Sequence, residues 1–541
     1  MTLGPVNLSR SPIVGGLRLS PAGRDDDTAT APDPLAQVPM LIELNARYPG
    51  GLVAVTRVFY RLWGDYESQA GGNWPAEANA VSPGGQPVPS GLAVVAVGLY
   101  QCVLSRAAAA DLVEQDRRSA QQAGKQPVIF RVWPDYPLYP HIDRSAPTVK
   151  ADAAWRSYNA HGQGVVWAVI DSGIDGCHEH FSALELYQEA RGVSLPDGLT
   201  SQLHQDFSYM VNPDDPGGPA PAGGPAPPTG AVPGLTDEFG HGTHVAGIIA
   251  GCSPPGRQPH VAESADPDGG YVPRAHVGVL SGMAPACELV SIKVTRRSSW
   301  GRWITSSSAV IKALTYLRTQ VNEDPDMLRV HGVNLSLGCG WDPSHYAAGQ
   351  SPLCRAVNQL VASGVAVVIS AGNSGANLMT GDAAGEAAPG AVMSSVSEPA
   401  HAQDCIAVGS THRDAPHAFG ITWTSGKGPT LDGRTKPDVV APGEWITSAA
   451  TGELRAEAGL DPAQADTSAD RFLTYAEQSG TSMAAPHVSG VIAAFLSARP
   501  EFIGRPQQVK DLLTKSATDL GRDPNAQGAG LVDVMRMLAN D

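Results

Sequence analysis

The most informative stretch of the sequence is SGTSMAAPHVSG, at residues 479–490. Gly480, Thr481 and Ser482 come before the small residues of MAA, a pattern that predicts the start of a helix at Ser482. The free N–H groups at a helix start favour negative charge, so they would stabilise an alkoxide and the oxyanion that its attack creates. Ser482 is therefore the candidate nucleophile of an acyl-transfer site.

Two further segments supply the partners that a serine nucleophile needs. VIDSGID, at residues 169–175, places Asp171 at the end of an apolar run that predicts a buried strand. GHGTHVAG, at residues 240–247, places His241 at a predicted helix start between two glycines. A nucleophilic serine needs a base within hydrogen-bond reach, and the base needs an acceptor that fixes its tautomer. The three segments therefore predict a triad of Asp171, His241 and Ser482.

The sequence beyond Pro147 has a pattern that is typical of an α/β protein. Apolar runs at residues 165–170, 289–294, 332–337 and 365–370 alternate with helical stretches. Buried strands that alternate with helices predict a parallel sheet, and such sheets carry their active sites at the strand C-terminal ends. Asp171 stands at such an end.

These segments resemble the subtilisin family, in the order Asp, His, Ser, from about residue 147 to the C-terminus. Five more segments that resemble the family occur in its order: SGMAPACELVSIKV (281–294), VNLSLG (333–338), ISAGNSG (369–375), KPDVVAPG (436–443) and QGAGLVDV (527–534). The resemblance implies a subtilisin-like three-layer fold with a central, mostly parallel sheet. It also implies a serine endopeptidase that forms an acyl-enzyme on Ser482, with His241 as general base and acid, Asp171 orienting His241, and Asn373 in the oxyanion hole.

The same resemblance assigns residues that would bind the substrate. The two walls of the S1 pocket would be Ser336, Leu337 and Gly338 on one side and Ser370, Ala371 and Gly372 on the other. SSWGRW, at residues 298–303, falls where the family has a rim strand, which implicates Gly301 and Trp303. Trp300 or Trp303 forms an apolar S4 floor in one interpretation and a simply packed side chain in the other.

The chemistry implied by the resemblance requires no cofactor. His241 and His244 lie three residues apart, but the HExxH pattern of zinc peptidases is absent, so no metal ligands are assigned. His180 stands where many secreted relatives have an aspartate that binds calcium, and the segment before Val277 is rebuilt by insertion. A structural calcium ion is therefore possible but has no supporting motif.

The N-terminal quarter predicts a second domain. Residues 1–38 are rich in Pro, Ala and Asp and predict a loose tail. Residues 39–138 predict a small α+β domain, with strands at 40–45, 52–63, 92–104 and 127–133 and a helix at 107–118. Its layout resembles the ferredoxin-like propeptide of subtilisins. This resemblance implies an intramolecular chaperone and inhibitor of a catalytic domain at residues 139–541, and hence a zymogen.

Several features of the sequence limit the possible binding partners and the cellular compartment. The net charge of -16 disfavours nucleic acid and anionic membranes, which need clustered Lys and Arg. The N-terminus lacks the apolar core of a Sec signal peptide, and no run approaches the roughly 20 apolar residues of a membrane span. The seven cysteines are scattered and form no CxxC pairs, which favours a reducing compartment. We expect a cytoplasmic protein, with non-Sec export left open, and Cys339 and Cys354 as the one conceivable disulfide. Two turn-rich insertions, near residues 212–234 and 253–273, are expected to be exposed loops.

Two rival functions fit parts of this pattern. A peptide ligase or cyclase uses the same triad and differs only in the pocket beyond the scissile bond. A catalytically silent binding protein would need a lost triad member, and none is lost. Hydrolysis of protein or peptide substrates is the main hypothesis.

Overall fold

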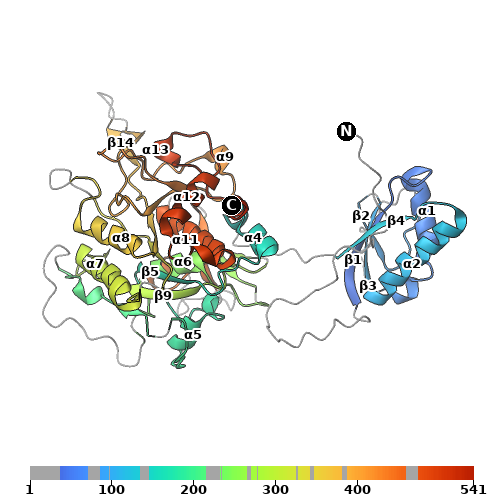
Figure 1. Ribbon diagram of the computed structural model, residues 1–541, viewed down its shortest axis with the longest axis horizontal. Coiled ribbons are helices and arrows are strands. Elements are labelled where there is room, and N and C mark those ends of the chain that lie inside the picture. Colours follow the sequence, from blue (N-terminus) through green and yellow to red (C-terminus); the bar gives the residue numbers. More distant parts are fainter. Residues whose placement is uncertain are drawn as a thin grey trace. The chain divides into compact units, whose positions relative to one another are not determined.

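The chain forms two compact units, Met1–Leu138 and Tyr139–Asp541 (Figure 1). The structure is a computed structural model that describes residues 37–540 except 71–85, 97, 135–144, 201, 215–231, 233, 257, 265–269, 277, 325–326, 341–346, 381–386 and 459–472. The predicted tail at 1–38 and insertion at 212–234 therefore lie almost entirely outside the described residues.

The first unit has the strand and helix order βαββαβ of a ferredoxin-like fold. Its sheet has the order β2-β3-β1-β4, and each neighbouring pair is antiparallel. The elements are β1 (Gln37–Leu44), α1 (Gly51–Trp63), η1 (Glu67–Gln69), β2 (Leu92–Ala96), β3 (Leu99–Ser105), α2 (Arg106–Ala123) and β4 (Ile129–Pro134). Alternate side chains of β1 and β3 enter a core that this unit forms by itself with α1 and α2.

The prediction of a strand at residues 52–63 is wrong. This segment is helix α1, whose buried residues Val55, Thr56, Phe59 and Trp63 fall on one helical face. The β-branched residues of this segment favoured a strand. Its large apolar residues, however, are spaced three or four apart, so a helix buries all of them on one face. The single strand predicted at 92–104 is a hairpin, β2 and β3, that turns at Gly98.

The second unit is built on a seven-stranded sheet in which all neighbouring strands are parallel. Its order is β17-β16-β13-β12-β5-β9-β6. The strands are β5 (Val166–Asp171), β6 (Gln205–Asp206), β9 (Glu288–Lys293), β12 (Gly332–Leu335), β13 (Ala366–Ser370), β16 (Ile406–His412) and β17 (Val439–Glu444). Every residue of β5, β12 and β13 is buried, as a parallel sheet covered on both faces requires.

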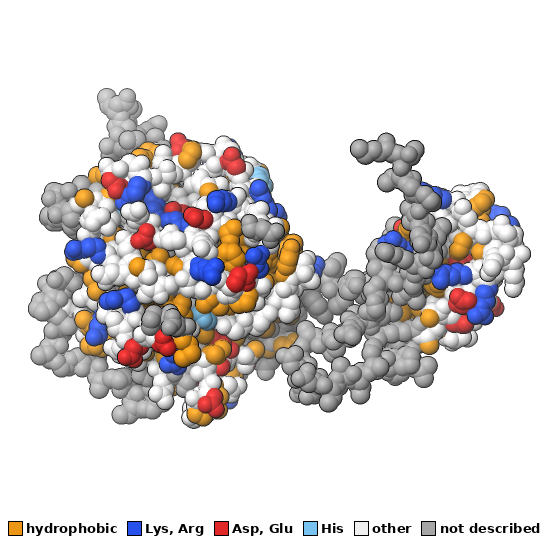
Figure 2. Space-filling model, viewed as in Figure 1, with side chains coloured by type: hydrophobic (Ala, Val, Ile, Leu, Met, Phe, Trp, Pro, Cys, Tyr) orange, Lys and Arg blue, Asp and Glu red, His pale blue; other side chains and the backbone are white. Residues whose placement is uncertain are grey.

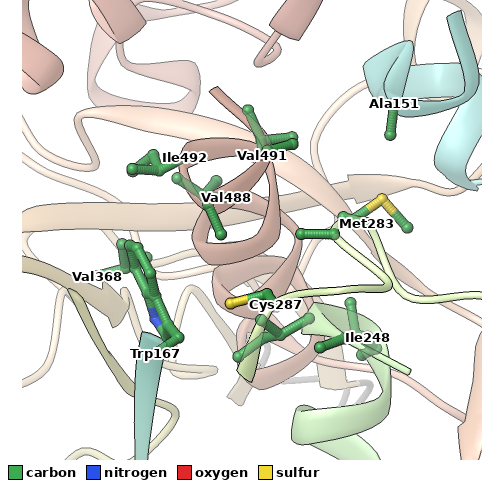
Figure 3. Close-up of a cluster of buried hydrophobic side chains, with 14 of the residues drawn as sticks. Ala151, Trp167, Ile248, Met283, Cys287, Val368, Val488, Val491 and Ile492 are labelled. Carbon is green, nitrogen blue, oxygen red and sulfur yellow. The ribbon is translucent and has the colours of Figure 1, made fainter. Parts of the chain in front are cut away.

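Helices cover both faces of this sheet, which gives the three layers. Helices α6 (His241–Ile249) and α11 (Thr481–Ala498) share one core with alternate residues of the strands. Helices α7 (Ser307–Tyr316) and α8 (Pro352–Ala362) share a second core with the intervening residues. Figure 3 shows Trp167 and Val368 of the sheet beside Val488 and Ile492 of α11. Among the described helices, α11 alone is long and apolar enough to cross a membrane, and 83% of it lies buried inside the protein, as in a core helix.

The insertion near residues 253–273 was predicted to be an exposed loop, but its described residues include two strands. Strands β7 (His260–Ser264) and β8 (Tyr271–Ala275) extend a second sheet of order β18-β19-β7-β8. Its other strands are β18 (Ile446–Ala449) and β19 (Leu473–Gln478), which immediately precedes the Ser482 segment. Val261 and Ala262 of β7 are buried in small apolar clusters, whereas Val272 to Ala275 of β8 are exposed, as predicted for this insertion.

The remaining elements connect these layers, and the short helices near both ends of the second unit add buried residues to its first core. They are α3 (Ser145–Val149), α4 (Ala151–Tyr158), η3 (Glu179–Phe181), α5 (Glu185–Ala190), η4 (Ser208–Met210), β10 (Arg296–Arg297), β11 (Trp303–Ile304), η5 (Leu317–Val321), β14 (Ala376–Thr380), β15 (Ala387–Ala391), α9 (Pro416–Phe419), α10 (Gly452–Glu457), η7 (Pro500–Phe502), α12 (Pro506–Ser516), α13 (Pro524–Gln527) and α14 (Val534–Ala539). Figure 2 shows acidic and basic side chains interspersed over the visible face of each unit.

Candidate active site

Asp171 is the last residue of β5 and is only 1% exposed. Its Oδ1 atom accepts a hydrogen bond from the Ser172 backbone N–H at 2.7 Å and another from His241 Nδ1 at 2.8 Å. A carboxylate oxygen can only accept, so Nδ1 of His241 carries the proton. The strand thus holds a fixed acceptor that sets the tautomer of His241.

His241 is the first residue of α6, and its position is fixed by the polar groups around the helix start. Gly242 N–H donates to Ser172 Oγ at 2.8 Å. Asp237, which the sequence did not single out, accepts from Gly240 N–H at 2.8 Å and from both the N–H and the hydroxyl of Thr243. This carboxylate caps the first turn of α6 and places a second negative charge near His241.

The pKa of His241 is raised above its ordinary value. Burial alone would lower the pKa, but the charge and hydrogen bond of Asp171 and the charge of Asp237 outweigh burial. The ring keeps 19% of its side-chain surface exposed. His241 therefore takes up a proton more readily than an isolated imidazole and still faces solvent.

Ser482 is the second residue of α11, a helix that packs against α6. Its Oγ donates to the Ser336 carbonyl at 3.2 Å, and Ser336 Oγ donates to the Ser482 carbonyl at 2.8 Å. The described hydrogen bonds of the Ser482 hydroxyl do not include His241. Bonds between catalytic groups are often long or misaligned until substrate is bound, and a rotation of the Ser482 side chain redirects the hydroxyl.

Asn373 contacts the residue just before Ser482. Its Oδ1 accepts from the N–H of Thr481 at 2.9 Å and from the Thr481 hydroxyl at 3.0 Å, which leaves the amide Nδ2 as a donor. A Cβ atom at Gly480 would lie 3.1 Å from Nδ2, and Gly480 has φ 151°, a conformation that favours glycine. The close approach of these backbones keeps Asn373 beside the start of α11.

Lys427 fixes the other end of the Asn373 loop, and no sequence pattern predicted this role for Lys427. Its buried ammonium group donates to the carbonyls of Gly375, Trp423 and Ser425 at 2.9–3.0 Å. Burial lowers the pKa of Lys427. Gly375 N–H donates to Thr424 O and Gly426 N–H to Gly372 O, so the loop is joined to residues 423–427 along its length.

The two predicted walls of the S1 pocket follow β12 and β13 and meet at one residue. Gly338 and Gly372 each lie so close to Ser397 that an added Cβ would stand 2.5 Å and 2.4 Å from its Oγ, respectively. Ser336, Ser370 and Ala371 are buried, while Leu337 is half-buried. Ser397 thus stands between the walls, a position that only the folded chain reveals.

The predicted rim segment is a short hairpin of β10 and β11 that turns at Gly301, where φ is 83°. Trp303 is half-buried, and its Nε1 donates to Glu453 Oε2 at 2.6 Å. Trp300 is 53% exposed. Of the two tryptophans, Trp303 is therefore the one that packs into the unit.

The comparisons with known proteins agree with this geometry. The model of the family described as "Subtilase family" matches residues 162–530, which include Asp171, His241, Asn373 and Ser482. The chain belongs to the subtilase family.

Three curated subtilases illustrate the similarity. Serine protease AprX of Bacillus subtilis is 30% identical over 55% of this chain and 57% of that protein. Pyrolysin of Pyrococcus furiosus is 28% identical over 70% of this chain and 26% of that protein. Subtilisin Savinase of Lederbergia lenta is 30% identical over 56% of this chain and 78% of that protein. The matched regions thus span 57% of AprX and 26% of pyrolysin.

His180 does not fit the calcium ligand that many secreted subtilases have at this position. Its Nε2 lies 3.1 Å from both Gly247 O and Ala250 O, and because carbonyls only accept, Nε2 carries a proton. Burial and the neighbouring His178 lower the pKa of His180 to about 3, so the ring is neutral. A buried N–H donor is unsuited to a hard cation that binds oxygen ligands. The described residues contain no group of three or more His, Cys, Asp or Glu that could hold a metal ion.

The suggested disulfide between Cys339 and Cys354 is not formed in this subtilase. All seven cysteines are free thiols; Cys354 is buried and Cys339 is exposed. Cys354, a buried residue of α8, belongs to the second core, and its Sγ instead donates to Glu398 Oε1 at 3.6 Å. The other histidines of α6 and α11, His244 and His487, are fully buried. Each donates a ring N–H to a backbone carbonyl, from His244 Nε2 to Ala476 O and from His487 Nδ1 to Met483 O.

Proposed function

We propose that this subtilase is a serine endopeptidase that acts through an acyl-enzyme on Ser482. The observation that carries the proposal is the 2.8 Å hydrogen bond between His241 Nδ1 and Asp171 Oδ1 at the start of α6. This bond leaves the other ring nitrogen, Nε2, free to accept a proton. Ser482 and Asn373 supply the nucleophile and the oxyanion donor at the start of α11.

The chain's own residues account for each step. The Ser482 hydroxyl turns from Ser336 O toward His241 Nε2, which takes its proton as Oγ attacks the scissile carbonyl. Asn373 Nδ2 and the Ser482 N–H donate to the oxyanion. The imidazolium, stabilised by Asp171, then gives its proton to the leaving amine as the C–N bond breaks, which leaves the acyl group on Ser482 Oγ. A water molecule next gives a proton to His241 Nε2 as it attacks this ester. The imidazolium returns the proton to Ser482 Oγ as the ester bond breaks and the carboxylic acid leaves.

Protein or peptide substrates suit the surroundings of this site. An extended peptide can add as a strand between the rim hairpin at Gly301 and the segment Ser336, Leu337 and Gly338. The P1 side chain then enters between that segment and Ser370, Ala371 and Gly372, with Ser397 at the meeting point of the walls.

One experiment separates hydrolysis from the two rival functions. The purified chain is incubated with a peptide library in the presence of a free amine nucleophile. We expect products that end in a free carboxylate. Products joined to the amine in preference to water would identify a ligase, and an unchanged library would identify a binding protein.

The acid limb of the pH–rate profile should lie above pH 6.5, the ordinary value for histidine. His241 acts as a base only when neutral, and its pKa is raised, so kcat/KM should increase as the pH rises through that raised value. The measurement is kcat/KM for a peptide substrate between about pH 5 and 9, a range that covers the titration of histidine. A midpoint below 6.5 would contradict the assignment of His241 as the base.

We also propose that the first unit is an inhibitor and folding assistant of the second. It has its own core, and within its described residues both helices, α1 and α2, pack on the same face of its sheet. The other face presents Leu41 and Val103 half-buried and is next to Phe130, which is 46% exposed. A parallel-sheet protease folds slowly because its contacts are non-local, and a docked domain lowers that barrier. The predicted junction at residues 136–141 lies outside the described residues.

Truncation tests the role of the first unit. We expect residues 139–541 alone to refold slowly, and residues 1–138 added in trans both to speed refolding and to inhibit hydrolysis. The measurement is the recovery of peptidase activity after dilution from denaturant. Rapid refolding without the added unit, together with no inhibition by it, would refute the proposal.

A further inference from the structure

Three aromatic rings form a stack that ends on the face of His241. The Phe239 and His241 ring centroids are 5.8 Å apart, and the planes meet at 18°. The Phe239 and Trp303 centroids are 5.3 Å apart, and their planes meet at 15°. Phe239 therefore lies between the indole of the rim hairpin and the imidazole of the candidate base.

The outer end of the stack is anchored by polar contacts. Trp303 Nε1 donates to Glu453 Oε2 at 2.6 Å, and Arg297 forms an ion pair with Glu453 Oε1 at 3.0 Å. Arg297 is also the strand partner of Trp303 in the rim hairpin. These contacts fix the plane of the indole against which Phe239 packs.

The backbone of Phe239 is fixed as well. Its carbonyl accepts from Leu454 N–H at 3.0 Å, and the carbonyl of Glu238 accepts from Glu453 N–H at 2.9 Å, so the first turn of α10 holds this segment. Asp237 caps α6 just before it. These contacts fix the main chain from which the half-buried Phe239 ring extends, and the ring itself packs between neighbours on either side in the stack.

We propose that Phe239 is a positioning residue for His241 and that its ring favours the imidazolium that His241 becomes when it takes the Ser482 proton. The inference rests on the proposed function. The hydrogen bond to Asp171 fixes the Nδ1 edge of the His241 imidazole, but the imidazole can still rotate about the axis of that bond. The flat Phe239 ring packed against the imidazole restricts this rotation. A cation over an aromatic face is attracted by the negative charge of the ring face.

The charged groups near His241 stay the same when Phe239 is replaced. Asp171 and Asp237 both raise the pKa of His241. On α6 and α11, His244 and His487 are buried, and burial lowers their pKa values to about 3 and about 4, so both are neutral. Lys293 pairs with Glu238, and Arg297 pairs with Glu453. Loss of the Phe239 ring also lets water reach His241, which by itself would raise the His241 pKa, so a fall in the midpoint is attributable to the lost attraction between the ring and the imidazolium.

The test uses a small fluorophosphonate that carries no peptide, so that a change in peptide binding does not enter the measured rate. The rate of inactivation of the full chain is measured against pH for the wild type, Phe239→Leu, Phe239→Tyr and Phe419→Leu. The last is a matched control, since Phe419 is 70% exposed and contacts His412 instead of the active site.

For Phe239→Leu we expect the acid-limb midpoint to fall by about half a pH unit and the plateau rate to fall by about two- to fivefold. Phe239→Tyr and Phe419→Leu should match the wild type. Trp303→Leu, which removes the outer ring, should shift the midpoint in the same direction by less, and it stands in if Phe239→Leu does not fold. Unchanged midpoints in these variants, with peptide hydrolysis alone impaired, would overturn the inference and leave Phe239 as a substrate contact. A wild type that does not react would instead contradict the proposed function.

Discussion

Ser482→Ala should lower peptide hydrolysis on the order of 10⁶-fold, which is the loss measured when subtilisin is deprived of its nucleophile. The variant should keep its fold, because the Ser482 hydroxyl makes only one described hydrogen bond as donor, to Ser336 O, at the solvent side of a preformed helix start. Turnover of a chromogenic peptide by the purified variant gives the rate, and the thermal unfolding midpoint reports the fold.

Ser497→Ala provides the matched control for this change. Ser497 lies on the same helix near its C-terminal end, where its hydroxyl donates to Ala494 O and accepts from Gly162 N–H. This variant should hydrolyse the peptide at nearly the wild-type rate. Wild-type turnover by Ser482→Ala would show that another residue is the nucleophile.

Asn373→Ala should lower kcat by about 10²–10³ while KM stays nearly unchanged, the range measured for the corresponding oxyanion donor of subtilisin. The amide donates only to an oxygen that becomes charged in the transition state, so its removal costs rate and not substrate binding. Steady-state kinetics with one peptide substrate separates the two parameters.

Asn373→Asp distinguishes the donor from mere support of the loop. It keeps an oxygen that can accept from Thr481 N–H and the Thr481 hydroxyl, but it replaces the donor by negative charge. The kcat of this variant should fall at least as far as that of Asn373→Ala. Full activity of Asn373→Asp would mean that the bond to Thr481, rather than donation to the oxyanion, is what Asn373 provides.

The parts of the site that lie within short segments were predictable from sequence. Asp171, His241 and Ser482 each stand beside glycines or small residues at a strand end or helix start, so local pattern and chemistry coincide. Asn373 followed from the family resemblance of its segment. The parallel sheet was predictable for the same reason, because its buried strands are continuous apolar runs.

The residues that tertiary contacts bring to the site were not predictable. Phe239, Ser397 and Lys427 lie in loops. Nothing in their local sequence predicts a ring stack, a close contact with both Gly338 and Gly372, or a buried ammonium group. Local propensity also failed at residues 52–63, where helical spacing prevailed over β-branched composition. It failed again at His260–Ser264, which form a strand paired with β19 within a turn-rich insertion.

The proposed function is tested most directly by locating the covalent adduct of a fluorophosphonate on the full chain by peptide mass spectrometry. We expect a single modified residue, Ser482, with labelling abolished in Ser482→Ala and slowed in His241→Ala. An adduct on another residue, an adduct that persists in Ser482→Ala, or a folded wild-type chain that takes up no probe would contradict a serine peptidase built on Asp171, His241 and Ser482.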